Sequence, residues 1–304
     1  MSHVPEPHRI ILGTVYSVLS IAALPLYLHI IALFLSREKY RQLMCYVAMA
    51  QIGLFDCVLL FGQVILGVLI ACDLRSWTHL NYIVSAITNT GWNGLFPSIL
   101  LLAVNRLDVI CALKLFRRRL YAYALLALCW LFAFCFFLLP CLTPFARIRI
   151  DFSLLLLDYD LRAPLSSGLQ SFEYIASFVF LGLTLTVYGA IVLLLMKKRR
   201  ELTSDQQMVA PAELRLMVQG SATFLSSALI VIGWHTSSAL MPKYYWVTAT
   251  VNLMIILNCG YLNPLLILAM NKEVREDVLQ PFRRSKMFLR TKRVGIIDSP
   301  GVSF

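Results

Sequence analysis

Charged residues are scarce in this chain of 304 residues, and their scarcity argues against a soluble fold. Asp, Glu, Lys and Arg make up only 14% of the residues, whereas hydrophobic residues make up 59%. A soluble domain carries about 25% charged residues, and a globule of this size could not bury so much apolar surface. Apolar runs of about 20 residues recur, each long enough to cross a hydrocarbon core of roughly 30 Å. The chain is therefore predicted to form one membrane domain.

The sequence also lacks the motifs of common enzyme and metal sites. It has no HExxH, no Gly-x-Ser-x-Gly and no paired acidic residues at membrane depth. It has no CxxC pair, no His/Cys spacing typical of a metal site, and no lysine in mid-span to hold a cofactor as a Schiff base. Five of the eight cysteines fall inside apolar runs and are interpreted as small hydrophobic residues: Cys45, Cys57, Cys129, Cys135 and Cys259. An enzyme, a metal and a cofactor are therefore not expected.

The apolar runs show no alternation of apolar and polar residues, which argues against the strands of a membrane barrel. Backbone groups in lipid must find hydrogen bonds within their own segment, so the runs are predicted to be helices. Seven spans are expected, at about 10–35, 44–71, 80–111, 121–140, 172–196, 214–240 and 244–270. The predicted fold class is thus an all-α membrane protein, a seven-transmembrane helix bundle.

Basic residues collect on one side of the predicted bundle. They are concentrated in the loops that start at Arg37, Lys114 and Lys197 and in the tail from Lys272 onward. The opposite side holds only Arg9, Arg75, Arg147, Arg149, Arg162 and Lys243. This bias predicts an extracellular N-terminus (1–9), a bundle (10–270) and a cytosolic tail (271–304). Membrane topology therefore explains the net charge of +11 better than binding to nucleic acid does.

The start of the tail carries a helical pattern. Val274, Val278, Leu279 and Phe282 fall on one face of residues 271–282, and the charged residues fall elsewhere. This pattern predicts a short amphipathic helix lying in the inner membrane interface, in contact with lipid.

Asp56 is the clearest charged residue at membrane depth, where charges are costly and tend to mark function. One interpretation is a neutral carboxyl group that is hydrogen-bonded inside the bundle. The other is a polar node that repacks between two states, with Asn263 as its partner. Pro264 removes a backbone donor and exposes a carbonyl one turn earlier, which gives a helix the two packed arrangements that a switch needs.

Arg106 closes the third span, directly after Asn105. An arginine at the cytosolic end of a helix is usually an anchor whose charged head reaches the interface. Together with Asp56 and the Asn263-Pro264 pair, a functional interpretation is preferred, in which Arg106 faces a cytosolic cleft.

These positions resemble the landmarks of rhodopsin-like receptors. The matches are the span-two aspartate (Asp56), the arginine of Asp-Arg-Tyr with altered neighbours (Asn105, Arg106, Leu107), the span-four tryptophan (Trp130, otherwise a packing residue) and Asn-Pro-x-x-Tyr with isoleucine last (Asn263, Pro264, Ile267). The resemblance implies a G-protein-coupled receptor, with Asp56, Asn105, Arg106, Asn263 and Pro264 as the activation switch.

More narrowly, the chain resembles the nematode serpentine chemoreceptors of class T or the related class X. The stretches that carry this likeness are 45–56, 101–108 and 268–275. The resemblance implies a receptor in the plasma membrane of sensory neurons, including their cilia. Such a receptor detects a small molecule and signals to a cytosolic heterotrimeric G protein.

Several family features are missing. Asn81 stands where such receptors carry a cysteine bonded to the second outer loop, and residues 143–166 contain no cysteine. Cys72 and Cys141, near outer helix ends, are candidates for a different disulfide, if their separation suits one. The sixth span lacks Cys-Trp-x-Pro and the fifth lacks proline, so the usual motion of these spans is not carried over.

A ligand is expected between the helices in the outer half of the bundle, where receptor pockets have mostly apolar walls. The candidate contacts are Asn89, Trp92 and Asn93 on the third span, with Glu173, Trp234, His235 and Asn252 from others. Each also has a plainer interpretation: the tryptophans as packing, His235 as a structural hydrogen-bonding residue and Glu173 as an outer-loop residue.

The main alternative function is a seven-span transporter or a ligand-gated channel subunit. Either would need a polar path across the membrane, and Asp56 is the only clear charge in mid-membrane. A ligand-driven current without any G protein would favour this alternative.

Overall fold

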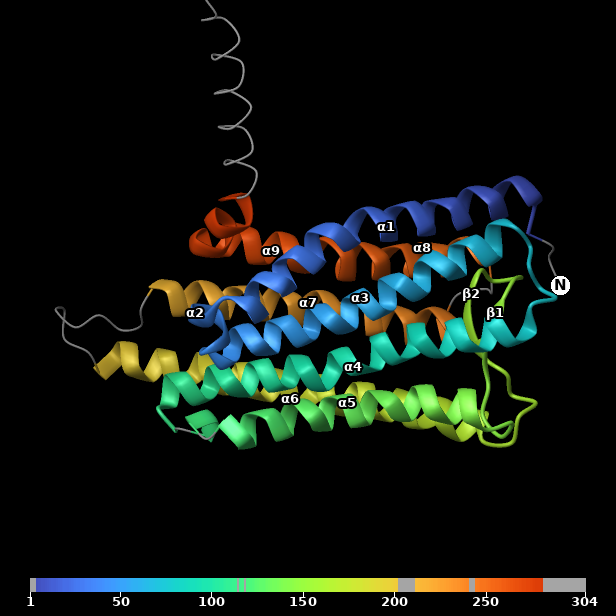
Figure 1. Cartoon of the computed structure of the whole chain (residues 1–304). Coiled ribbons are helices and arrows are strands. Elements are labelled where there is room, and N and C mark those ends of the chain that lie inside the picture. Colours follow the sequence, from blue (N-terminus) through green and yellow to red (C-terminus); the bar gives the residue numbers. More distant parts are fainter. Residues whose placement is uncertain (1–3, 114, 118, 202–210, 241–243, 281–304) are drawn as a thin grey trace, which may run out of the picture.

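The computed structural model describes residues 4–113, 115–117, 119–201, 211–240 and 244–280. Within these residues, seven helices are long and apolar enough to cross a membrane, and they lie side by side (Figure 1). They are α1 (Glu6–Ser36), α3 (Met44–Ala71), α4 (Thr78–Cys111), α5 (Arg119–Leu142), α6 (Ser166–Glu201), α7 (Pro211–Leu240) and α8 (Tyr245–Leu257), which continues through η2 (Asn258–Leu262) into α9 (Asn263–Met270). The predicted seven-helix bundle is confirmed, although α1 begins at Glu6 rather than at residue 10.

Short elements mark the two ends of the bundle. A hairpin of β1 (Ile148–Asp151) and β2 (Leu156–Tyr159) lies at the end that holds the N-terminus, and α2 (Glu38–Arg41) lies at the other end (Figure 1). The one-turn helix η1 (Leu115–Arg117) follows α4. The hairpin was not predicted, since residues 143–166 were expected to be a plain loop.

Glycines allow α1 and α3 to touch. A Cβ atom on Gly67 would lie 2.4 Å from the carbonyl oxygen of Gly13, and one on Gly13 would lie 2.5 Å from the carbonyl oxygen of Gly67. The Ser17 hydroxyl donates a hydrogen bond of 2.8 Å to the carbonyl of Val64 across the same crossing. Helices in lipid associate through such close backbone contact and interhelical hydrogen bonds.

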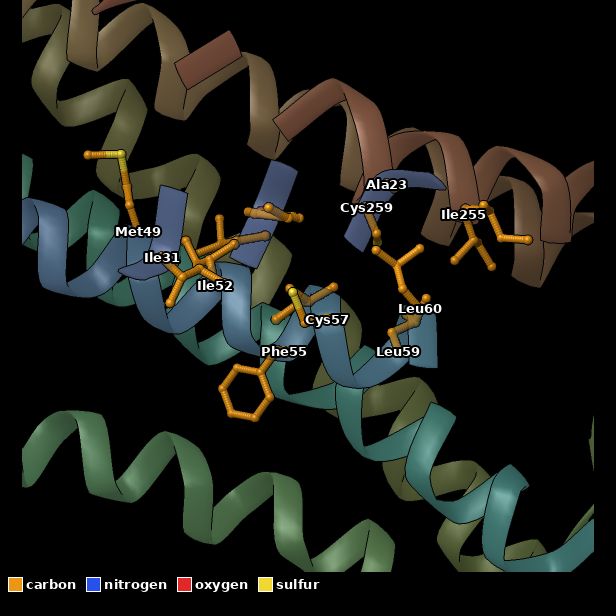
Figure 2. Packing of buried hydrophobic residues seen from close by; sticks show 14 of the residues in the cluster. Ala23, Ile31, Met49, Ile52, Phe55, Cys57, Leu59, Leu60, Ile255 and Cys259 are labelled. Atoms are coloured by element: carbon orange, nitrogen blue, oxygen red, sulfur yellow. The ribbon is translucent and has the colours of Figure 1, made fainter. Parts of the chain in front are cut away.

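Aromatic packing joins α3 to α5. Figure 2 shows Phe55 pointing from α3 toward α5, where its ring centroid lies 4.2 Å from that of Trp130. Gly94 of α4 leaves room for this ring, because a Cβ there would lie 2.3 Å from Phe55. Trp130 is therefore a packing residue.

The last span changes its hydrogen-bond pattern midway along its length. Residues Asn258–Leu262 form a π-helical turn directly before Pro264. A proline leaves the carbonyl four residues earlier without its usual donor, and here that residue, Gly260, lies inside the wider turn. Such bulges are frequent at functional sites.

The predicted amphipathic helix is present over residues 272–280. Val274 and Val278 are buried, and Leu279 is exposed on the outside of the helix. Phe282 and the basic residues that follow lie outside the described residues. The helix packs beside α2, because the Asp277 carboxylate accepts hydrogen bonds from Arg37 at 2.9 Å and from Tyr40 at 2.7 Å.

Candidate functional site

A cavity of about 720 Å³ opens at the hairpin end of the bundle. This volume lies in the range of sites that hold small organic molecules. Its walls come from α3, α4, α6, α7, α8 and the hairpin, and they include all of the predicted ligand contacts except one: Asn89, Trp92, Glu173, Trp234, His235 and Asn252. Residues that are far apart in the sequence thus meet around one space.

Asn93 is the exception and lies behind the wall. Its side chain is fully buried, and its amide donates to the backbone oxygen of Asn89 at 3.0 Å and to the Asn89 side-chain oxygen at 3.2 Å. Asn93 therefore holds Asn89 in position and is not itself part of the cavity wall.

A buried carboxylate forms one corner of the cavity. The Tyr159 hydroxyl donates to the Glu173 carboxylate, and the Asn89 amide lies 3.4 Å from the same carboxylate oxygen and 3.1 Å from the Tyr159 hydroxyl. Glu173 is only 7% exposed, so it is not an outer-loop residue. Burial, and then the neighbouring Glu173 charge, raise the pKa of Tyr159 well above its usual value. The phenol therefore remains a hydrogen-bond donor.

Two amides in the cavity wall pair with each other. Gln63 of α3 donates to Asn252 of α8 at 2.9 Å, and Asn252 donates back at 3.2 Å. Although other neutral polar residues such as Asn89 were among the residues predicted from the sequence, Gln63 was not. Its spacing of seven residues from Asp56 places both on one helix face, and this signal would have found it.

Aromatic residues complete the wall. Trp92 packs edge-on against Phe96 with ring centroids 5.2 Å apart, and His235 packs edge-on against Tyr174 at 4.8 Å. Trp92 and His235 thus serve both as packing residues and as parts of the cavity wall.

The hairpin covers the cavity and reaches into the bundle. The Thr248 hydroxyl of α8 donates to the carbonyl of Leu154 at the hairpin tip, and the neighbouring Leu155 side chain is fully buried. The Asp151 side chain accepts a hydrogen bond of 2.7 Å from the backbone of Ser153 and so closes the turn. The tip is therefore a fixed part of the site.

No disulfide holds this hairpin within the described chain. Cys72 and Cys141 both carry free thiols, so the candidate disulfide between them is not formed. The hairpin base is joined to the start of α6 instead, because the backbone N–H of Arg147 donates to the Ser166 hydroxyl at 2.9 Å. The Arg75 guanidinium also lies over the Phe152 ring, 5.3 Å from its centroid. Cation–π and hydrogen-bond contacts thus connect this loop to the bundle.

The second polar cluster lies deep in the bundle around Asp56. The Asn263 amide donates to the Asp56 carboxylate at 2.9 Å, and the Tyr27 hydroxyl donates to the same oxygen at 2.5 Å. All three side chains are buried. The predicted contact between Asp56 and Asn263 is therefore present, whereas Tyr27 was missed. The cluster connects α1, α3 and the last span.

Arg106 is 2% exposed and Asn105 is 4% exposed, both near the end of α4 that lies away from the hairpin. An interfacial anchor would leave its charged head at the surface, so that interpretation does not describe Arg106. The Arg106 side chain is covered in this structure, and its position at a cytosolic cleft stays a prediction. Nearby, the carboxylate of Asp108 accepts backbone hydrogen bonds from Leu115 at 2.7 Å and Phe116 at 3.3 Å, which fixes η1.

The bundle has the fold of rhodopsin. Squid rhodopsin superimposes with a TM-score of 0.70, covering 94% of this chain and 88% of that chain, at 13% sequence identity. No protein-family model and no curated protein matches the sequence. The structural similarity shows that the seven helices are arranged as in a rhodopsin-like G-protein-coupled receptor.

Proposed function

We propose that this protein is a chemosensory G-protein-coupled receptor that binds a small molecule beneath the hairpin. The observation that carries the proposal is the cavity of about 720 Å³ lined by polar and aromatic side chains from five helices and the hairpin. With the N-terminus outside, as the charge bias indicates, the cavity opens to the cell exterior. Arg106 and η1 then lie on the cytosolic side, where a heterotrimeric G protein binds.

In this proposal the Asp56 cluster connects the cavity at the outer end of the bundle to Arg106 at the cytosolic end. An agonist shifts the bundle only if it binds one arrangement better than another. Asp56 joins Tyr27 and Asn263 across three helices, and the π-helical turn before Pro264 gives the last span a point of rearrangement. The active arrangement would uncover Arg106 and Asn105 for the G protein.

The assignment to a particular class of chemoreceptor rests on sequence motifs alone. The stretches 45–56, 101–108 and 268–275 favour a nematode serpentine chemoreceptor of class T or X. On this assignment the protein works in the plasma membrane of sensory neurons, including their cilia.

The test is a second-messenger assay in cells that present a panel of volatile and small-metabolite ligands to the receptor. Arg106→Ala is expected to abolish the response while cell-surface expression remains, because Arg106 acts on the cytosolic side only. Arg149→Ala on the hairpin, whose side chain is 46% exposed, is the matched control and is expected to respond normally.

An undiminished response of Arg106→Ala would refute the role assigned to Arg106. A ligand-driven current in membranes without any G protein would replace the receptor proposal with the transporter or channel alternative. Epitope tags that locate the N-terminus in the cytosol would refute the orientation on which the proposal depends.

A further inference from the structure

We infer that the cavity is a site for an organic cation, with the Glu173 carboxylate as its counter-ion. This inference rests on the proposed function, because it names the ligand class of the same site. It is carried by the surroundings of Glu173 and by the composition of the cavity wall.

The carboxylate has only neutral partners. Glu173 is 7% exposed, and its hydrogen bonds come from the Tyr159 hydroxyl and the Asn89 amide. Neither group carries a positive charge. Removing a carboxylate from water costs several kcal/mol unless a cation compensates it. A bound cation would supply that compensation.

Three arginines at this end of the bundle are engaged elsewhere. Arg75 forms an ion pair with Asp73 at 2.6 Å, and Arg149 lies 4.0 Å from Asp160. Arg147 lies over the ring of Tyr82, 5.0 Å from its centroid. No Lys or Arg is among the residues of the described chain that line the cavity. A positive charge beside Glu173 would therefore have to come from the ligand.

The rest of the wall suits a cation with an apolar body. Trp92, Trp234 and Tyr174 line the same cavity as Glu173, and aromatic faces attract ammonium groups. The Gln63 and Asn252 amides donate hydrogen bonds to each other, so they have little need of a polar group on the ligand. A carboxylate ligand would be repelled by Glu173 and would find no basic partner on the described wall. The chemistry therefore favours an arylalkylamine or a quaternary ammonium compound.

The experiment measures binding to the purified full-length chain without any G protein. Thermal unfolding is followed by thiol labelling, since Cys45, Cys57, Cys129 and Cys259 are buried and become reactive on unfolding. The probes are 2-phenylethylamine, tryptamine and phenethyltrimethylammonium, matched with 2-phenylethanol and phenylacetate. The amines are expected to raise the unfolding midpoint with an apparent affinity about tenfold or more above that of the alcohol, and phenylacetate is expected to have no effect.

Three variants test the role of the charge. Glu173→Gln keeps the size of the side chain but removes its charge, so the preference for amine over alcohol is expected to vanish. Glu173→Asp keeps the charge and is expected to retain the preference with weaker binding. Glu276→Gln, which removes an exposed carboxylate at the other end of the bundle, is the control and is expected to behave as wild type.

The inference is overturned if the amines and the alcohol shift wild type equally, if no amine shifts it, or if Glu173→Gln keeps the preference. Any of these results would make Glu173 a protonated, structural hydrogen-bonding residue. Failure of the receptor proposal looks different. Amine binding that never stimulates nucleotide exchange on a G protein would leave the cation site in place and remove the receptor function. Nucleotide exchange that is stimulated only by neutral ligands would support the receptor function and remove the cation site.

Discussion

Single polar side chains mark the two ends of this bundle. The Asp56 cluster, which lies deep between them, allows the contribution of one hydroxyl group to stability to be tested. Tyr27→Phe removes a donor to Asp56 without changing the packed ring. A buried hydrogen bond within a membrane protein contributes on average about 0.6 kcal/mol and at most about 1.7 kcal/mol. We expect the variant to unfold at a slightly lower temperature, measured by thiol labelling of the purified chain.

Tyr121→Phe is the control for this measurement, because Tyr121 is 50% exposed on the surface of α5, and it should unfold as wild type does. If Tyr27→Phe is as stable as the control, the hydroxyl contact contributes nothing to the folded state, and Asp56 relies on Asn263.

Among single residues, the sequence could identify as functional candidates those that belong to a recognisable motif. Asp56, Asn263 and Arg106 stood out because charges and Asn-Pro pairs are rare in apolar runs. Gln63 carried one usable signal, its spacing of seven residues from Asp56. Tyr27 could not be recognised, since a lone tyrosine in a long helix is compatible with many contacts. Their partners become evident only when distant helices are placed together.

Whole elements depend on how closely their backbones approach, and the crossing of α1 and α3 shows this most clearly. Gly67→Ala would place a methyl group 2.4 Å from the Gly13 carbonyl oxygen and from the Ser17 hydroxyl oxygen, so the helices must separate. We expect a loss of about 1–3 kcal/mol, as for other overpacked interiors, seen as a lower unfolding midpoint. Gly182→Ala on α6 is the matched control, because a Cβ there meets nothing within 4 Å. Equal midpoints for the two variants would contradict this prediction.

The contact between α2 and the 272–280 helix is predicted to depend on pH. Partial burial alone would raise the pKa of Asp277, but hydrogen bonds from Lys39 and Tyr40 and the charge of Arg37 lower it below its usual value. A lowered pKa in the folded state stabilises the fold at neutral pH, and this stabilisation is lost as the pH falls through that lowered value. The difference in unfolding midpoint between wild type and Asp277→Asn should therefore be present at pH 7 and disappear in strong acid.

Glu276→Gln is the control for the acid titration, since Glu276 is exposed and lies 3.9 Å from Lys272. A surface pair of this kind contributes little. A difference between wild type and Asp277→Asn that stays constant down to strong acid would mean that the Asp277 charge does not stabilise the helix contact.

Element by element, long periodic patterns were predictable and short irregular ones were not. The 272–280 helix followed from the spacing of Val274 and Val278. The hairpin could not be foreseen, because its strands are four residues each and its turn places Leu155 at a φ of 57°, a conformation that leucine rarely adopts. Contacts of the tip with α8 hold that conformation, and no local pattern encodes them.

For the whole molecule, the structure combines a cavity at one end with a covered Arg106 at the other. Near that end α6 packs against α7, where a Cβ on Gly220 would lie 2.4 Å from the Tyr188 hydroxyl oxygen and 3.9 Å from Leu102 of α4. On the proposed function, the arrangement with Arg106 covered is the inactive one, and loosening that packing should raise basal activity. A shift of about 1 kcal/mol between the two arrangements changes their ratio roughly fivefold.

Gly220→Ala is therefore expected to raise nucleotide exchange on a G protein several-fold in the absence of ligand, because the added methyl group displaces Tyr188 from α7. The measurement uses the purified protein in lipid nanodiscs with a purified heterotrimeric G protein. Gly189→Ala on α6 adds the same methyl group where nothing lies within 4 Å, and its basal exchange should match wild type. A Gly220→Ala variant that folds, still binds ligand and keeps wild-type basal exchange would show that this helix contact does not hold the inner end closed. The covering of Arg106 would then have to be released by another part of the bundle, and the π-helical turn before Pro264 would be the next place to test.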